Sequence, residues 1–230
     1  MRKGTIFNYE LRRLLLSKEY PLLLIATLFF SVSLLRGMVL FGTSFTAPFS
    51  ALTFGTYCAS VTPFLLILLL VLCARQSKAS ERGAETIIGA TPMPLPVFRL
   101  LRYGAIGCAF LFSVTLPLTT CLLFYRLVFD YTAVGNLLIL GLLLLLPPAI
   151  LLFGAAMLLG SRKSAAVYGL LAVVLIVGVF QIPLPALFDF IGRATDYELT
   201  PVFIAGRVVV TGIGAVLILT SLFLTKKQHE

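Results

Sequence analysis

The stretch LLILLLVL at residues 65–72 decides the fold class of this chain of 230 residues. It presents no polar face to water, and residues 142–146 and 173–180 form similar apolar runs later in the chain. The whole chain is 60% hydrophobic and only 12% charged, whereas a soluble domain is about 25% charged and about 45–50% apolar. The sequence therefore predicts an all-α membrane protein, with residues 1–230 forming a single transmembrane domain.

Six apolar runs are long enough to cross a bilayer, which takes roughly 20 apolar residues per helix. The predicted spans are residues 20–42, 51–74, 101–125, 136–160, 165–182 and 201–225. The first residues lead into a charged segment rather than an apolar signal core, so we expect no removable signal peptide. Six spans occupy most of the chain, and we expect no separate soluble domain.

The charge distribution predicts the orientation of these spans. Both chain ends, with the loops after the second and fourth spans, carry 14 of the 18 basic residues and five of the nine acids, a net charge of +9. The opposite side carries four basic and four acidic residues, a net charge of zero. Arg36 and Arg207 lie near span ends, close enough for their side chains to reach the outer interface. Because basic loops stay in the cytoplasm, we expect cytoplasmic termini in a multi-pass protein of the plasma (inner) membrane, and no nucleic-acid binding.

Missing residue types exclude several chemistries. The only histidine, His229, lies in the polar tail, so neither a histidine metal site nor a catalytic triad can be assembled. The four cysteines lie in or beside apolar runs without a CxxC spacing and are interpreted as packing residues: Cys58, Cys73, Cys108 and Cys121. No phosphate-binding loop motif occurs, so the chain itself is not expected to bind ATP. No acid lies within a predicted span, which argues against an ion-driven carrier that works alone.

Residues 1–19 form the first of three segments that are not simple spans. An apolar stripe recurs at helical spacing in this segment and consists of Phe7, Leu11, Leu14, Leu15 and Lys18. The stripe predicts an amphipathic helix that lies in the cytoplasmic interface before the first span. A simple N-terminal extension of the first span is the alternative.

The second segment is the cytoplasmic loop at residues 75–99, which contains a short predicted helix. Ser80 can cap this helix, and Glu81 lies in its first turn, at the positive end of the helix dipole. Ala84, Ile87 and Ile88 form an apolar face on it. From the residues alone, this surface either docks a partner or packs back on the bundle.

Two motifs resemble those of a known family. The loop motif reads ERGAETIIGATP at residues 81–92, and the chain opens with FNYELRR at residues 7–13. With six predicted spans and an N-terminal interfacial helix, these motifs resemble the ABC-2 type permeases, the membrane subunits of one class of ATP-binding-cassette exporter.

The resemblance implies that the chain is one half of a transporter driven by other subunits. In that family the loop carries a coupling helix that enters a cleft on a P-loop ATPase subunit. The complex holds two ATPase copies and a second permease chain, identical or homologous, with ATP and Mg on the ATPase and no cofactor or catalysis on the permease. The residues of this chain that match the coupling element are Glu81, Gly83, Glu85, Ile87, Ile88, Thr91 and Pro92.

The third segment, residues 183–200, is expected on the outer face. It is too apolar for a solvated loop and too polar for a span, which favours either a re-entrant helix or a surface interfacial helix. The resemblance supports the re-entrant form, since the family has such helices between its last two spans.

The function that follows is export of an amphiphilic substrate, with the export direction and the coupling mode both taken from the resemblance. A non-transporting membrane scaffold or sensor subunit of a complex is the alternative, because such a protein would also need a docking loop. An intramembrane enzyme is disfavoured, since histidine and acidic groups are missing from the predicted spans.

Overall fold

The computed structural model describes residues 3–39, 47, 50–77, 94–180 and 201–223, and the regular secondary structure within these ranges is entirely helical. The all-α class predicted from the sequence is therefore confirmed. The elements are α1 (Lys3–Leu15), α2 (Glu19–Leu34), the π-helical segment η1 (Leu35–Val39), α3 (Ala51–Gln76), α5 (Leu95–Phe129), α6 (Val134–Arg162), α7 (Ser164–Phe180) and α8 (Pro201–Phe223).

Five of these helical segments are long and apolar enough to cross a membrane. They are Glu19–Gly37, Ala51–Gln76, Leu95–Phe129, Val134–Arg162 and Pro201–Phe223, and each overlaps one of the six predicted spans, although Leu95–Phe129 extends beyond the predicted residues 101–125 at both ends. The transmembrane character of the chain is thus supported element by element.

Helix α7 corresponds to the remaining predicted span, residues 165–182. Its 17 residues extend about 26 Å at 1.5 Å per residue, less than the roughly 30 Å of a bilayer core. Tyr168 near its start lines a pocket with Ala74 near the end of α3, and a Cβ atom on Gly178 would lie 3.0 Å from Pro63. Since Pro63 is near the middle of the 26-residue α3, the described part of α7 covers about half the height of that helix.

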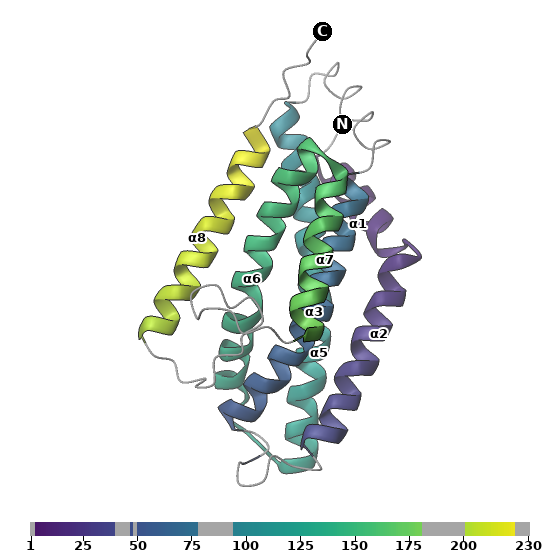
Figure 1. Cartoon of the computed structure of the whole chain (residues 1–230). Helices are drawn as coiled ribbons and strands as arrows, with labels where there is room; N and C mark the ends of the chain where they lie inside the picture. Colours follow the sequence, from purple (N-terminus) through teal and green to yellow (C-terminus); the bar gives the residue numbers. More distant parts are fainter. Residues whose placement is uncertain (1–2, 40–46, 48–49, 78–93, 181–200, 224–230) are drawn as a thin grey trace.

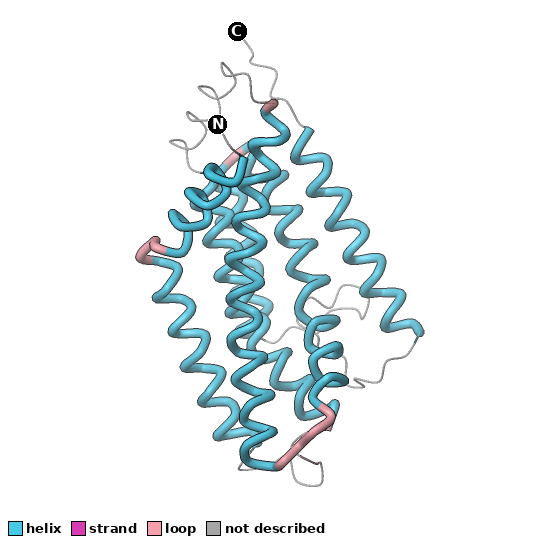
Figure 2. Tube along the Cα trace, turned by 180° about the vertical axis from the view of Figure 1, so that it is seen from behind, coloured by secondary structure: helices cyan, strands magenta, loops and turns pink. Residues whose placement is uncertain are grey.

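The bundle is built around α3. Figure 1 shows α2, α5, α6 and α7 running alongside α3, with α8 (yellow) on the outer side of α6, and Figure 2 shows the same arrangement from behind. The apolar stretch at residues 65–72 forms the centre, because its leucines at positions 65, 66, 68, 69, 70 and 72 are at most 2% exposed. The run that decided the fold class is therefore the core of the bundle.

Polar residues at the helix ends explain where the helices begin and end. The backbone N–H of Thr53 donates to the Ser50 side chain at 3.2 Å and caps α3. Asp130 ends α5 in the left-handed conformation with φ of 51°, which Asp tolerates better than most residues. Lys163 is extended between α6 and α7, so these two helices form a tight hairpin.

Two glycines allow α6 and α8 to cross at close range. A Cβ atom on Gly154 would lie 2.6 Å from the carbonyl oxygen of Gly214, and a Cβ on Gly214 would lie 2.7 Å from the backbone nitrogen of Leu151. Small residues that let two backbones approach are typical of helix pairs in membranes. This crossing fixes α8 to α6, although most of the α8 surface is exposed.

Helix α1 is a separate element rather than an extension of α2. A turn at residues 16–18 ends α1 before α2 begins at Glu19, and the Ser17 hydroxyl donates to the Leu14 carbonyl at 2.7 Å within it. The predicted stripe packs against the bundle: Leu14 is 1% exposed, and Phe7, Leu11 and Leu15 contact the core. The stripe that predicted an interfacial helix is thus used for packing on α5.

Candidate functional site

The predicted coupling residues lie outside the described residues. Glu81, Gly83, Glu85, Ile87, Ile88, Thr91 and Pro92 all belong to residues 78–93, and so does the predicted helix that carries them. The outer segment at residues 183–200 also lies outside the described ranges. The structure does describe the two points at which the chain enters and leaves this predicted coupling loop.

The entry point is held by the end of α3. The Ser77 hydroxyl donates to the Cys73 carbonyl at 2.9 Å, and the Ser77 backbone N–H donates to the Cys73 and Ala74 carbonyls. Ser77 is buried and packs on Gly160, where a Cβ atom would collide with its hydroxyl oxygen. The chain therefore enters the loop from a position fixed against the end of α6.

The exit point is the start of α5. Pro94 precedes the helix and accepts hydrogen bonds from the backbone N–H groups of Val97 and Phe98. One turn further, Arg99 is buried and donates from Nη1 to the carbonyls of Leu222 at 3.4 Å and Ser221 at 3.5 Å. These carbonyls belong to the last described turn of α8, and backbone carbonyls of a helix point toward its C-terminal, negative end. Arg99 thus ties the start of α5 to the end of α8.

Arg102 ties the same part of α5 to α1. The Glu10 carboxylate of α1 lies 2.8 Å from Arg13 Nη2 and 3.9 Å from Arg102 Nε. The side chains of Glu10 and Arg102 are only 8% and 2% exposed, and the Arg102 guanidinium also stacks 5.4 Å from the centre of the Phe98 ring. A buried carboxylate between two guanidinium groups needs these partners, because an unpaired buried charge is strongly unfavourable.

We refer to Glu10, Arg13, Arg99 and Arg102, with the carbonyls of Ser221 and Leu222, as the charged junction. It joins three helices, α1, α5 and α8, and its two α5 residues lie within about two turns of the start of α5. Sequence reasoning treated these side chains only as cytoplasmic charges. Glu10 carried a signal for burial, because it lies three residues after Phe7 and four before Leu14, on the same helix face.

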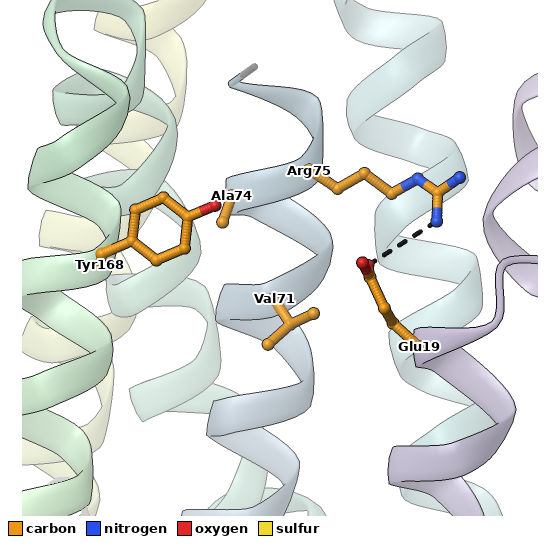
Figure 3. Close-up of a pocket in the computed structure, with 5 residues that line it drawn as sticks. All are labelled: Glu19, Val71, Ala74, Arg75 and Tyr168. Carbon is orange, nitrogen blue, oxygen red and sulfur yellow. Dashed lines mark ion pairs between the residues drawn. The ribbon is translucent and has the colours of Figure 1, made fainter.

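A small pocket lies on the flank of α3. It has a volume of about 110 Å³ and is lined by Glu19, Val71, Ala74, Arg75 and Tyr168. In Figure 3, the Arg75 side chain extends from α3 toward Glu19 on α2, and the Tyr168 hydroxyl lies near Ala74 on the other side of α3. Arg75 Nη1 and Glu19 Oε2 are 3.7 Å apart, and both side chains are partly exposed.

Hydrogen bonds between helices hold the interior of the bundle. The Tyr57 hydroxyl donates to the Pro117 carbonyl at 2.8 Å and lies 2.6 Å from the Ser31 hydroxyl, so it joins α2, α3 and α5. The Tyr20 hydroxyl donates to the Ala109 carbonyl at 3.0 Å and lies 2.9 Å from Ser113. These contacts satisfy polar groups where lipid would offer no partner, and they indicate packing rather than catalysis.

Arg207 and Arg36, both expected near the outer interface, differ in exposure. Arg207 is only 5% exposed, and its guanidinium lies 4.9 Å from the centre of the Phe203 ring on the same helix. Arg36, by contrast, is exposed as expected. Phe203 and Arg207 lie one helical turn apart and therefore share a face of α8.

The cysteines agree with a packing role at three positions. Cys58, Cys73 and Cys121 are buried and Cys108 is exposed, and all four are free. In the portion of the chain that the structure describes, no group of three or more His, Cys, Asp or Glu residues could hold a metal ion.

Searches of protein families, curated proteins and solved structures find no match for this chain.

Proposed function

We propose that this chain is the permease subunit of an ATP-binding-cassette exporter, powered by separate P-loop ATPase subunits that dock on the loop around residues 80–91. The proposal rests on the loop motif and on the charged junction that follows it. The substrate class that suits the apolar helices is an amphiphile. The complex would hold two ATPase copies and a second permease chain, identical or homologous.

The observation that carries the proposal is the position of the charged junction. Arg99 and Arg102 lie in the first two turns of α5, directly after the coupling loop, and contact the end of α8 and the middle of α1. A displacement of the loop by an ATPase would therefore move α1, α5 and α8 together. Such a rigid connection suits a subunit that converts closure of a partner into movement of transmembrane helices.

The proposed topology has six spans and cytoplasmic termini. The contacts of the charged junction and of Ser77 with Gly160 bring the start of α5 and the ends of α3, α6 and α8 to one end of the bundle. That end bears the basic loops, which favours a cytoplasmic location in the plasma membrane. In this topology residues 165–182 complete the fifth crossing, and residues 183–200 close the outer end.

The test is recruitment of the ATPase by loop variants. An exposed ion pair contributes only about 0–1 kcal/mol, whereas an apolar anchor at the centre of an interface contributes about 2 kcal/mol or more. We therefore combine Glu85→Arg with Ile88→Asp and purify the tagged chain from its native membranes. We expect the P-loop ATPase to co-purify with the wild type at least about tenfold more than with the double variant.

The matched control places two charge changes in the other cytoplasmic loop, Arg162→Glu with Ser164→Asp, where we expect a much weaker loss. Membrane insertion and thermal unfolding are measured for all three proteins to show that they fold. A double variant that still recruits the ATPase at the wild-type level would exclude this loop as the coupling element.

A further inference from the structure

The pocket on the flank of α3 carries one positive and one negative side chain side by side. Arg75 Nη1 approaches Glu19 Oε2 at 3.7 Å, longer than a hydrogen bond between these groups. Glu19 is the only ion-pair partner that the structure shows for Arg75 within the described ranges. The guanidinium has five N–H donors and the carboxylate has two oxygens, so both groups retain hydrogen-bonding capacity toward a ligand. Tyr168 contributes a further hydroxyl on the α7 side (Figure 3).

An apolar strip leads away from this pocket along α3. Phe64, Ile67 and Val71 precede Arg75 at helical spacing. They are less buried than the neighbouring leucines, and α2 and α7 both pack on α3. The Phe30 ring of α2 packs on Phe64 with ring centres 4.3 Å apart. The strip thus runs from a polar pocket at the end of the helix toward the middle of the bundle.

We propose that this pocket and strip bind one molecule of phosphatidylethanolamine. The lipid phosphate accepts hydrogen bonds from Arg75, and the lipid ammonium donates to Glu19. The Tyr168 hydroxyl donates to the headgroup from the opposite wall, and an acyl chain lies along Phe64, Ile67 and Val71. The site therefore takes a zwitterionic phospholipid with a primary ammonium group, independently of what the protein transports.

The charges decide between lipid classes. A headgroup with net negative charge would be attracted by Arg75 but repelled by Glu19 at close range. The quaternary ammonium of phosphatidylcholine has no N–H to donate to the carboxylate. Phosphatidylethanolamine matches both groups, whereas phosphatidylglycerol and phosphatidylcholine each match only Arg75 through the phosphate.

The experiment is native mass spectrometry of the full-length protein with added phosphatidylethanolamine, phosphatidylcholine or phosphatidylglycerol. We expect one tightly retained phosphatidylethanolamine on the wild type. Glu19→Gln should reduce its affinity about threefold to fivefold, as for one partly exposed ion pair, and should improve phosphatidylglycerol binding. Arg75→Gln should weaken all three lipids. The matched control is Arg36→Gln, which removes an exposed arginine at the other end of the α2–η1 segment and should change nothing.

Two results would overturn the proposal. One is a wild type that prefers phosphatidylglycerol or shows no preference, and the other is a Glu19→Gln variant with unchanged lipid selectivity. If a variant fails to fold, stepwise N-methylation of the lipid on wild-type protein decides the question. Affinity should fall as N–H donors are lost, and a flat series would contradict the assigned ammonium contact.

Discussion

At the scale of single residues, the fate of each charge depends on its helix face. Glu10 and Glu19 lie nine positions apart, yet the Glu10 side chain is 8% exposed and that of Glu19 is 52% exposed. Glu10 lies on the apolar face that α1 packs on α5, and two arginines compensate for its burial. Glu10 thus belongs to a buried ion network, whereas Glu19 belongs to a partly exposed surface pair.

Glu10→Gln should therefore destabilise the protein much more than Glu19→Gln. Removing one partner of a buried ion pair costs roughly 3–5 kcal/mol because the remaining charge is left buried without compensation. Removing one partner of an exposed pair costs about 0–1 kcal/mol. The free energy of unfolding in mixed detergent micelles measures both, and equal losses for the two variants would show that Glu10 is not held in a buried network.

The sequence predicted that these residues are charges near the membrane surface, but it did not predict their burial or their contact partners. Arg99 and Arg102 contributed to the predicted orientation of the chain as cytoplasmic charges. The periodicity of one helix cannot, however, reveal which residues of another helix it contacts. The Arg99 contacts join positions 122 and 123 residues apart. Arg207 shows the same limit, because its position near a span end did not reveal that it is only 5% exposed in the structure.

At the scale of elements, the close approach of α6 and α8 depends on glycine at the point of contact. Gly214 is the residue of α8 at which α6 approaches, and its missing side chain leaves room for the backbone of Ile150 and Leu151. Gly212, two residues earlier, faces open space, with nothing within 4 Å of a Cβ atom built on it. The two glycines therefore differ in function although they lie in the same helix.

Gly214→Ala should separate α6 from α8 and lower stability by about 1–3 kcal/mol, the usual range for overpacking. Gly212→Ala should be neutral or stabilising by up to about 1 kcal/mol, because alanine favours a helix. In a Cys108→Ser background, which removes the exposed thiol, the buried thiols of Cys58, Cys73 and Cys121 allow unfolding to be followed with a thiol-reactive dye. A Gly214→Ala protein as stable as Gly212→Ala would contradict the close crossing.

Most elements were predictable because their apolar runs exceed the length of a bilayer crossing. The α7 segment is the exception, since residues 165–182 form the shortest of the six predicted spans and polar and proline-containing residues follow directly. The N-terminal helix was predicted from its stripe, but a stripe fits equally well against lipid or against α5. Only the packing of Leu14 and Phe7 distinguishes the two.

At the scale of the whole molecule, the predicted orientation in the membrane can be tested with exposed residues at the two ends of the bundle. Thr132 lies exposed in the α5–α6 loop, and Lys163 lies exposed between α6 and α7 at the opposite end. In a cysteine-free background, Thr132→Cys should react with an impermeant maleimide on intact cells. Lys163→Cys should react only after permeabilisation, and its labelling on intact cells would reverse the topology.

The assignment as an ATPase-driven permease is tested most directly by ATP hydrolysis in material purified through a tag on this chain. We expect magnesium-dependent, vanadate-sensitive hydrolysis from the wild-type complex. The chain freed of its partner should neither hydrolyse ATP nor gain thermal stability from it, since no phosphate-binding loop occurs in the sequence. A complex from native membranes without ATP hydrolysis, or saturable ATP binding by the isolated chain, would contradict the assignment.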